Sequence, residues 1–438
     1  GLPAFNYSVN FFENSLRLDR YNTERIEQSR GPNSILFGLG SPGGVVNVVT
    51  KKASEGREFG SLRFQVNAIN GLRTEVDYNH VLIPKKLAVR VAAVRDHENG
   101  WRFREFDEQD RVYLTAGWQI TPRTRLDVEG ERGSVHKSLL QMMPASDAYT
   151  NWVAAGRNVG AAPNTAQAIK RISTTNYQVV DTSTGVAMNW INKTNSTTNT
   201  VGGVQIWISD PTVVAHDVVI GAGVGFPQNT EYWRSSFALT HAVSSDLTFE
   251  LAGNMQDSDQ EAVTARGGTL LQVDTSPTLP NNQPNPNVGK AYVEHFPGTV
   301  DAYDGSKNLR LSGAYTKDLG RWFGKHQFAA LYQLDWIQRQ AWQMRPIFVT
   351  NPYITTDPLN GQNNIRFRTY VEVRGDRSLI GHADWRRFFG GGDDFRDHTF
   401  QVRDAVTGRE MTAAFTYNSV PGRSEERRVG KECRSRWS

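Results

Sequence analysis

From residue 60 onward, apolar and polar residues alternate with a period of two along much of the chain. In one stretch, the apolar residues Val112, Leu114 and Trp118 alternate with the polar residues Arg111 and Thr115. Similar stretches lie near residues 61–68, 125–131, 233–240, 247–255, 309–316 and 327–336. Alternation of this kind predicts β-strands with one apolar face. These stretches, together with the turns that separate neighbouring strands, predict nine strands up to about residue 340, and further strands are predicted at 365–373 and 410–418.

The predicted strands are about 10 residues long, which suits a tilted membrane-spanning strand better than a strand of a soluble sheet. Their connections are alternately short and long. Tight turns are predicted near residues 83–86, 121–124 and 243–246, and long connections at about 97–109, 133–230 and 257–306. The exception is Asn70-Gly71, which predicts a two-residue hairpin. Short turns on one side and long loops on the other are typical of an outer-membrane β-barrel.

The alternation by itself is compatible with two folds. One is a soluble antiparallel sheet with one face in water, and the other is a barrel whose apolar face contacts lipid. Trp118, Trp233 and Trp336 lie near predicted strand ends, where membrane barrels carry aromatic girdles. Strand length and the sorting of the loops favour the barrel.

Composition narrows the choice further. Of the 438 residues 38% are hydrophobic, the mean hydropathy is −0.52, and no apolar run reaches the roughly 20 residues of a membrane-spanning helix. The 49 basic and 45 acidic residues nearly balance and form no evident basic face, so we expect no nucleic-acid partner. Cys433 is the single cysteine, which excludes an internal disulfide. Because Gly1–Ala4 lacks the features of a signal peptide, we expect the numbering to start inside a longer precursor.

Residues 24–52 form the most distinctive segment, with the order Glu-Arg-Ile-Glu, then Arg-Gly-Pro, then a glycine-rich stretch, then Val-Asn-Val-Val-Thr-Lys. Within it, residues 38–43 match the dinucleotide-binding pattern G-x-G-x-x-G. That pattern binds nucleotides between a strand and a following helix. Here Pro42 removes a backbone donor and the β-branched residues 45–50 predict a strand. We therefore expect no nucleotide site.

The whole segment closely resembles the C-terminal part of the plug domain of TonB-dependent outer-membrane receptors. Within it, the sequence Asn-Ser-Ile-Leu-Phe-Gly at residues 33–38 looks most like that of ferric-siderophore receptors. The resemblance implies an incomplete receptor: the end of a plug at 1–52, a linker at 53–59, and about half of a 22-stranded antiparallel transmembrane β-barrel at 60–422 with long extracellular loops. Gln28 and Ser29 stand where the family often has apolar residues. Residues 423–438 continue no strand, and we expect a non-native tail resembling vector read-through, the alternative being a genuine charged tail.

The resemblance also implies which residues of the motif support the plug. Charged contacts with the barrel wall are expected from Arg25, Glu27 and Arg30, although a solvated charge cluster is an alternative. The remaining motif residues are expected to be structural: Gly31, Pro32, Gly38, Gly43, Gly44 and Asn47.

No other chemistry is evident in the sequence. The nine histidines are scattered without a metalloprotease motif, and no nucleophile elbow is present. We expect no catalytic residues, no metal site and no cofactor, so the protein is predicted not to be an enzyme. Aromatic residues in the long loops could stack on a ligand or pack the loops themselves. The ligand candidates are Trp101, Tyr149, Trp152 and Tyr292.

The resemblance implies active import of a large, scarce nutrient, with a ferric siderophore expected first and cobalamin or a glycan as other cargoes. The implied partners are TonB with its ExbB/ExbD energising complex, the ligand, and outer-membrane lipid of a Gram-negative bacterium. A half barrel leaves two strand edges open in hydrocarbon, so this chain alone is not expected to transport. The alternative is a soluble or surface-attached β-rich glycan-binding protein.

Overall fold

The computed structural model describes most of the strands in full detail. The described residues are 6–29, 45–101, 105–138, 146–154, 156–157, 159, 176–191, 200–201, 204–205, 212–213, 227–266, 270–279, 282–318, 324–348, 365–373, 399–404 and 406–417. No helix among them is long and apolar enough to cross a membrane.

The first described segment forms a small four-stranded sheet, here called the plug sheet, in the strand order β2-β1-β4-β3. Its elements are β1 (Asn6–Val9), β2 (Phe12–Glu13), β3 (Thr23–Ser29) and β4 (Val45–Thr50). A single 3-10 turn, η1 (Arg20–Asn22), lies between β2 and β3. Strand β1 is parallel to β4, whereas β3 and β4 are antiparallel.

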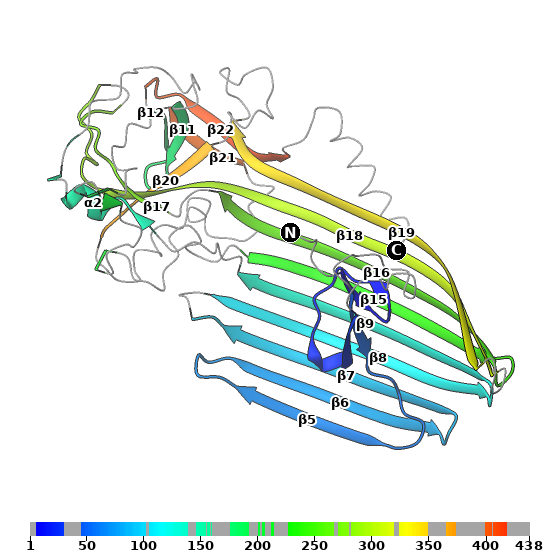
Figure 1. Cartoon of the computed structure of the whole chain (residues 1–438). Helices are drawn as coiled ribbons and strands as arrows, with labels where there is room; N and C mark the ends of the chain where they lie inside the picture. Colours follow the sequence, from blue (N-terminus) through cyan, green and yellow to red (C-terminus); the bar gives the residue numbers. More distant parts are fainter. Residues whose placement is uncertain are drawn as a thin grey trace.

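Nine long strands follow and form a continuous antiparallel meander, here called the barrel wall (Figure 1). They are β5 (Phe59–Val66), β6 (Leu72–Ile83), β7 (Leu87–Asn99), β8 (Phe106–Thr121), β9 (Thr124–Ser138), β15 (Pro227–Ala242), β16 (Leu247–Arg266), β18 (Ala291–Asp318) and β19 (Lys325–Phe348). The number of strands agrees with the prediction from alternation. Figure 1 shows them side by side in an open, curved sheet, with the dark blue plug sheet against one face.

The end of the barrel wall that adjoins the long connections is here called the long-connection end. Short strands extend the sheet beyond this end of β18 and β19. They are β10 (Ser146–Asp147), β11 (Asn176–Asp181), β12 (Val186–Ile191), β17 (Leu270–Val273), β20 (Ile365–Val371), β21 (Thr399–Asp404) and β22 (Glu410–Tyr417). Strands β20, β11, β12, β21 and β22 link β18 back to β19 and are here called the upper sheet. The six-residue helix α2 (Tyr149–Ala154) and a separate pair, β13 (Thr200–Val201) with β14 (Val204–Gln205), complete the elements. Strands β20 and β22 confirm the two later predictions.

The register of the wall separates its two faces. One continuous cross-strand row on the outward face is apolar throughout and runs Leu87, Trp118, Leu126, Leu239, Leu251, Leu311, Tyr332. A row on the inward face is polar and runs Asn79, Arg90, Thr115, Glu129, Ser236, Asn254, Asn308, Asp335. The period of two therefore produces an apolar outer surface and a polar inner one, as expected for a membrane barrel.

The predicted turns at 83–86, 121–124 and 243–246 are confirmed, but several connections differ from the prediction. At 67–71 five residues join β5 to β6, so the predicted two-residue hairpin is wrong, although Asn70 does adopt a positive φ of 62°. Strands β16 and β18 pair as far as Arg266 with Phe296, so they run well into the predicted loop at 257–306. Beyond the apolar rows the outward positions of β16 are Asp257, Asp259 and Glu261, so hydrophobic alternation no longer marks the strand there.

Candidate functional site: the plug–barrel interface

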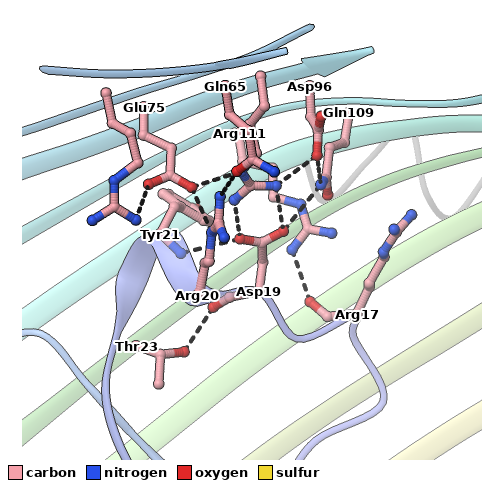
Figure 2. Close-up of polar contacts among 12 residues, drawn as sticks. Arg17, Asp19, Arg20, Tyr21, Thr23, Gln65, Glu75, Asp96, Gln109 and Arg111 are labelled. Atoms are coloured by element: carbon pink, nitrogen blue, oxygen red, sulfur yellow. Dashed lines mark hydrogen bonds and ion pairs between the residues drawn. The ribbon is translucent and has the colours of Figure 1, made fainter. Parts of the chain in front are cut away.

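The plug chain meets the barrel wall where it turns between β2 and β3. Asp19 is the N-cap of η1, and its carboxylate accepts a hydrogen bond of 3.0 Å from the backbone N–H of Tyr21. The Thr23 hydroxyl donates to the carbonyl of Asp19 at 2.7 Å and closes the same turn. This local capping holds Asp19, Arg20 and Tyr21 against the inward face of the wall (Figure 2).

Asp19 lies at the centre of a buried ionic network with the wall. Its carboxylate accepts two hydrogen bonds from the Arg73 guanidinium, at 2.5 and 3.2 Å, and one of 3.0 Å from Gln109. Arg73 also donates to Asp96 and to Glu75, each at 2.6 Å. The side chains of Arg73, Asp19 and Asp96 are 10%, 9% and 6% exposed, so this network is shielded from solvent. Burial alone would raise the pKa of Asp19, but the hydrogen bonds from Arg73 and Tyr21 outweigh it and hold that pKa below its ordinary value.

The lowered pKa of Asp19 predicts how the interface responds to pH. A carboxyl group whose pKa is lower in the folded state stabilises that state fully above its unfolded pKa of about 4, and loses this contribution as pH falls through the folded value. We expect Asp19→Asn to lower the thermal unfolding temperature by the same amount throughout pH 5 to 8. Below about pH 4 the difference from the unmodified protein should shrink. A difference that changes between pH 5 and 8 would contradict this assignment.

Two further arginines reach the wall at more exposed positions. Arg17 forms an ion pair with Asp107 at 2.6 Å, and Arg20 donates to Glu75 at 2.9 Å and to Gln65 at 2.7 Å. The Arg17 and Arg20 side chains are 39% and 51% exposed. Solvent-exposed pairs of this kind stabilise a structure only weakly. These two pairs therefore mainly position the plug chain on the wall and add little to its stability.

Glu131 on β9 is a second heavily bonded carboxylate of the interface. It accepts hydrogen bonds from the hydroxyls of Tyr21 and Tyr232, both at 2.8 Å, from the Asn22 amide at 2.9 Å, and from Arg234 at 3.0 Å. Tyr21 and Asn22 come from the plug, while Tyr232 and Arg234 come from the wall. The Arg234 and Glu131 side chains are 5% and 6% exposed. This carboxylate therefore joins the plug and two neighbouring wall strands in one buried cluster.

Glu129, two residues earlier on the same face, repeats this arrangement. Its carboxylate accepts hydrogen bonds from Asn10 at 2.9 Å, from Thr50 at 2.6 Å and from Tyr113 at 2.8 Å. Asn10 follows β1, and Thr50 ends β4. The inner strands of the plug sheet are thereby attached to the wall through one side chain.

The segment that follows β4 is also attached at several points. Lys51 forms an ion pair with Asp77 at 2.8 Å, and Asp77 also binds the Arg90 guanidinium at 2.7 Å. The buried amide of Asn79 accepts from the backbone N–H of Ser54 at 2.9 Å and donates to the Ser54 carbonyl at 2.9 Å. These bonds fix the chain where it passes from the plug sheet into the first wall strand.

The other end of the plug sheet contacts the late strands of the wall. The Arg310 guanidinium lies 4.6 Å from the centre of the Phe12 ring and donates to Glu250 at 3.2 Å. Arg339 on β19 binds Glu13 at 2.7 Å. Plug contacts are thus spread from β5 to β19.

The motif residues predicted to bind the wall are placed differently. Among the described residues, Arg25 forms its ion pair with Glu27 of the same strand, at 2.7 Å, and their side chains are 62% and 37% exposed. The hydrogen bond from Arg25 holds the pKa of Glu27 below its ordinary value. Asn47 is buried, and its side-chain oxygen accepts from the Ser8 hydroxyl at 3.0 Å and from the backbone N–H of Phe11 at 2.8 Å. Six predicted residues lie outside the described part of the chain: Arg30, Gly31, Pro32, Gly38, Gly43 and Gly44.

Sequence reasoning missed the residues that do join the plug to the wall. The signal was present as inward-facing charged residues within the alternation, such as Glu129, Glu131 and Arg73. It could not be read as an interface because their partners lie far away in sequence: Tyr21 and Glu131 are 110 residues apart.

The four ligand candidates fall into two groups. Trp101 is 65% exposed, and the rings of Tyr149 and Trp152 form a tilted pair on α2 with centroids 5.7 Å apart. Tyr292, in contrast, is fully buried, and the Arg368 guanidinium lies 3.9 Å from its ring centre. Tyr292 therefore packs the junction of β18 and the upper sheet, which is the alternative role foreseen for the loop aromatics. Among the described residues, no three His, Cys, Asp or Glu side chains are grouped so as to hold a metal ion.

Known proteins are similar in sequence to part of this chain. No protein-family model matches it. It is 34% identical to the metal-pseudopaline receptor CntO of Pseudomonas aeruginosa over 116 residues, which are 26% of this chain and 16% of the relative. It is 29% identical to the ferrioxamine B receptor of Salmonella typhimurium over 119 residues, again 26% and 16%. The match thus spans about a sixth of either relative's length. Both relatives are receptors rather than enzymes.

Solved structures share the fold over most of the chain. The ferripyoverdine receptor of the outer membrane of Pseudomonas aeruginosa covers 87% of this chain with 40% of its own, at 12% identity and a TM-score of 0.51. BauA, the ferric preacinetobactin receptor of Acinetobacter baumannii, covers 84% with 42% of its own, at 14% identity and a TM-score of 0.50. Together with the motif at 24–52 and the plug sheet seated on a polar barrel wall, these likenesses show that the chain has the fold of outer-membrane receptors and resembles siderophore and metallophore receptors in sequence over about a quarter of its length.

Proposed function

We propose that the protein imports a ferric siderophore, or a similar metal chelate, across the outer membrane of a Gram-negative bacterium. The observation that carries the proposal is the plug–barrel interface, in which buried carboxylates of the wall hold a small folded sheet. A wall with a polar inner face and an apolar outer face supports a multi-pass β-barrel in lipid. The names of the curated relatives favour metal chelates over cobalamin or a glycan as cargo.

The interface suits a plug that must be held and then moved. The buried bonds to Asp19, Glu129 and Glu131 are ionic or charge-assisted, and such bonds are shorter and stronger than neutral ones. Among the described residues, apolar packing between plug and wall occurs in small clusters, such as Tyr21 with Ala92, Val94 and Tyr113. A mechanical pull on the plug can therefore break a limited set of specific contacts. In this proposal the pull comes from TonB, energised by ExbB and ExbD.

The domain division belongs to the same proposal. Residues 1–52 serve as the end of the plug, 53–59 as a linker and 60–422 as barrel, with 423–438 as a non-native tail. In this proposal Arg25 and Glu27 support the plug through their own ion pair on β3, and Arg30 keeps its predicted contact with the barrel wall. Trp101, Tyr149 and Trp152 remain the candidates for ligand contact at the long-connection end.

Uptake measurements test the proposal directly. In a strain grown under iron limitation, deletion of the gene should abolish uptake of at least one radiolabelled ferric chelate from a panel of hydroxamates, catecholates and carboxylates. Reintroducing the gene should restore it, and deletion of tonB should abolish it again. Uptake that continues without TonB, or no gene-dependent uptake of any chelate, would overturn the proposal. A glycan-binding protein, the alternative function, would instead be water-soluble and show no change of gel mobility on heating.

A further inference from the structure

On the outward face of the barrel wall, the cross-strand rows change from apolar to charged between the short turns and the long-connection end. Below this transition, toward the short turns, outward rows are apolar, as in the row from Val89 through Val128 and Phe237 to Leu309. Above it the next rows contain charged side chains. Two cations stand at the boundary, and each lies directly opposite a tryptophan of the neighbouring strand: Arg132 opposite Trp233, and Lys307 opposite Trp336. All four side chains point outward and are exposed.

Each cation lines a groove in the outer surface. The first groove has a volume of about 570 Å³ and is lined by Arg132 together with Val76, Ala93 and Val112. The second, of about 530 Å³, is lined by Lys307 together with Trp233, Met255 and Trp336. Trp233 and Trp336 are 41% and 56% exposed, so their rings remain accessible from outside. In each groove the cation shares the lowest row with apolar side chains and therefore borders the apolar rows below the groove.

The protein does not neutralise these two cations itself. Among the described residues, neither Arg132 nor Lys307 forms an ion pair within 4.0 Å. The nearby acids are occupied or stand higher. Asp257, which lines the second groove, accepts a hydrogen bond of 2.7 Å from the Tyr303 hydroxyl.

In the first groove, Asp110 lies 3.7 Å from Arg95 and is thereby partly neutralised. Glu231 stands in the same row as Asp110, one row farther from the apolar surface than Arg132. Both carboxylates therefore border the groove on its aqueous side and leave the Arg132 guanidinium facing the boundary.

From this arrangement we propose that each groove binds a phosphorylated membrane lipid, whose phosphate contacts Arg132 in the first groove and Lys307 in the second, and whose acyl chains lie along the apolar rows below. A guanidinium or ammonium group beside tryptophan at a membrane boundary matches that chemistry, because the ring sits at headgroup level while the cation bonds a phosphate oxygen. The outward charges would otherwise be a cost at the edge of hydrocarbon. This inference rests on the proposed function for the placement of the wall in a membrane.

Lipid retained by the purified receptor provides the test. The receptor is extracted in a mild detergent, washed extensively and analysed by native mass spectrometry for bound phosphorylated lipid. Replacing both cations, as Arg132→Gln with Lys307→Gln, should reduce the retained lipid by about tenfold or more, since each cation loses a charge-assisted hydrogen bond. The matched control is Lys86→Gln, an exposed lysine at the short-turn end, which should retain lipid as the unmodified receptor does.

The folding of the double variant is checked by its heat-dependent gel mobility, which should match that of the unmodified receptor. Equal lipid retention by the double variant and the control would overturn the proposal, as would displacement of the lipid by millimolar inorganic phosphate. Chelate uptake should persist in both variants. If the unmodified receptor retained lipid but supported no chelate uptake, that result would count against the proposed function alone.

Discussion

Replacing Glu131 with alanine is expected to destabilise the docked plug by about 3–5 kcal/mol, the range for removing one partner of a buried ion pair. The change removes a carboxylate that accepts four hydrogen bonds, and it leaves the Arg234 guanidinium buried beside only the more distant Glu129 carboxylate, at 3.9 Å. Hydrogen exchange followed by mass spectrometry should show faster exchange of the backbone amides of residues 6–29.

The matched control is Glu108→Ala, on the neighbouring wall strand. Glu108 is 42% exposed and pairs with His97, whose side chain is 49% exposed. Because surface pairs contribute little, exchange in the plug should change by less than about 0.5 kcal/mol. Equal effects of the two substitutions would mean that Glu131 does not hold the plug. Glu131→Gln should fall between them, since the amide can accept some of the bonds but cannot balance Arg234.

Replacing Arg368 with methionine is expected to have a similarly large effect, about 3–5 kcal/mol, confined to the upper sheet and its junction with β18. Arg368 is fully buried, binds Glu294 through two nitrogens at 2.5 and 2.8 Å, and lies 3.7 Å from Asp274. Its loss leaves two buried carboxylates without their main counter-charge. Limited proteolysis should then cut within residues 270–279 or 365–373, while the barrel wall stays intact.

The control for this prediction is Arg366→Met on the same strand. Arg366 binds Glu294 at 3.2 Å but is 24% exposed, so its removal should cost clearly less. Combining Arg368→Met with Glu294→Leu should recover part of the lost stability, because it replaces an ionic pair by apolar side chains. Cleavage of the wall strands in the Arg368→Met variant would show instead that the two regions unfold together.

The wall was predictable because its folding rule is local. Every second residue of a strand such as β8 faces outward, so the positions of Val112, Leu114 and Trp118 are enough to predict the strand and its orientation. The rule fails where the outward positions become polar, and there the ends of β16 and β18 were placed too early. The sequence also could not distinguish Tyr292, fully buried under Arg368, from the accessible loop aromatics.

The interface was far less predictable than the wall. The motif resemblance pointed to Arg25 and Glu27, yet these bind each other at an exposed edge of the plug sheet. Asp19, Glu129 and Glu131 carry the contacts instead. Their importance depends on three-dimensional proximity, and nothing in the local sequence of η1 or β9 states which distant side chain will satisfy each carboxylate.

The sequence separation of these contacts has a consequence for how the chain acquires its structure. Asn10 and Glu129 are 119 residues apart, and Glu13 and Arg339 are 326 residues apart. Contacts of such high order require long chain closures before any stabilisation is gained, which slows folding. The hairpins of the barrel wall can form early because their contacts are local. The charged inner face stays hydrated until the plug sheet docks against it. The last and slowest step of folding is therefore expected to be the loss of water from the plug–barrel interface.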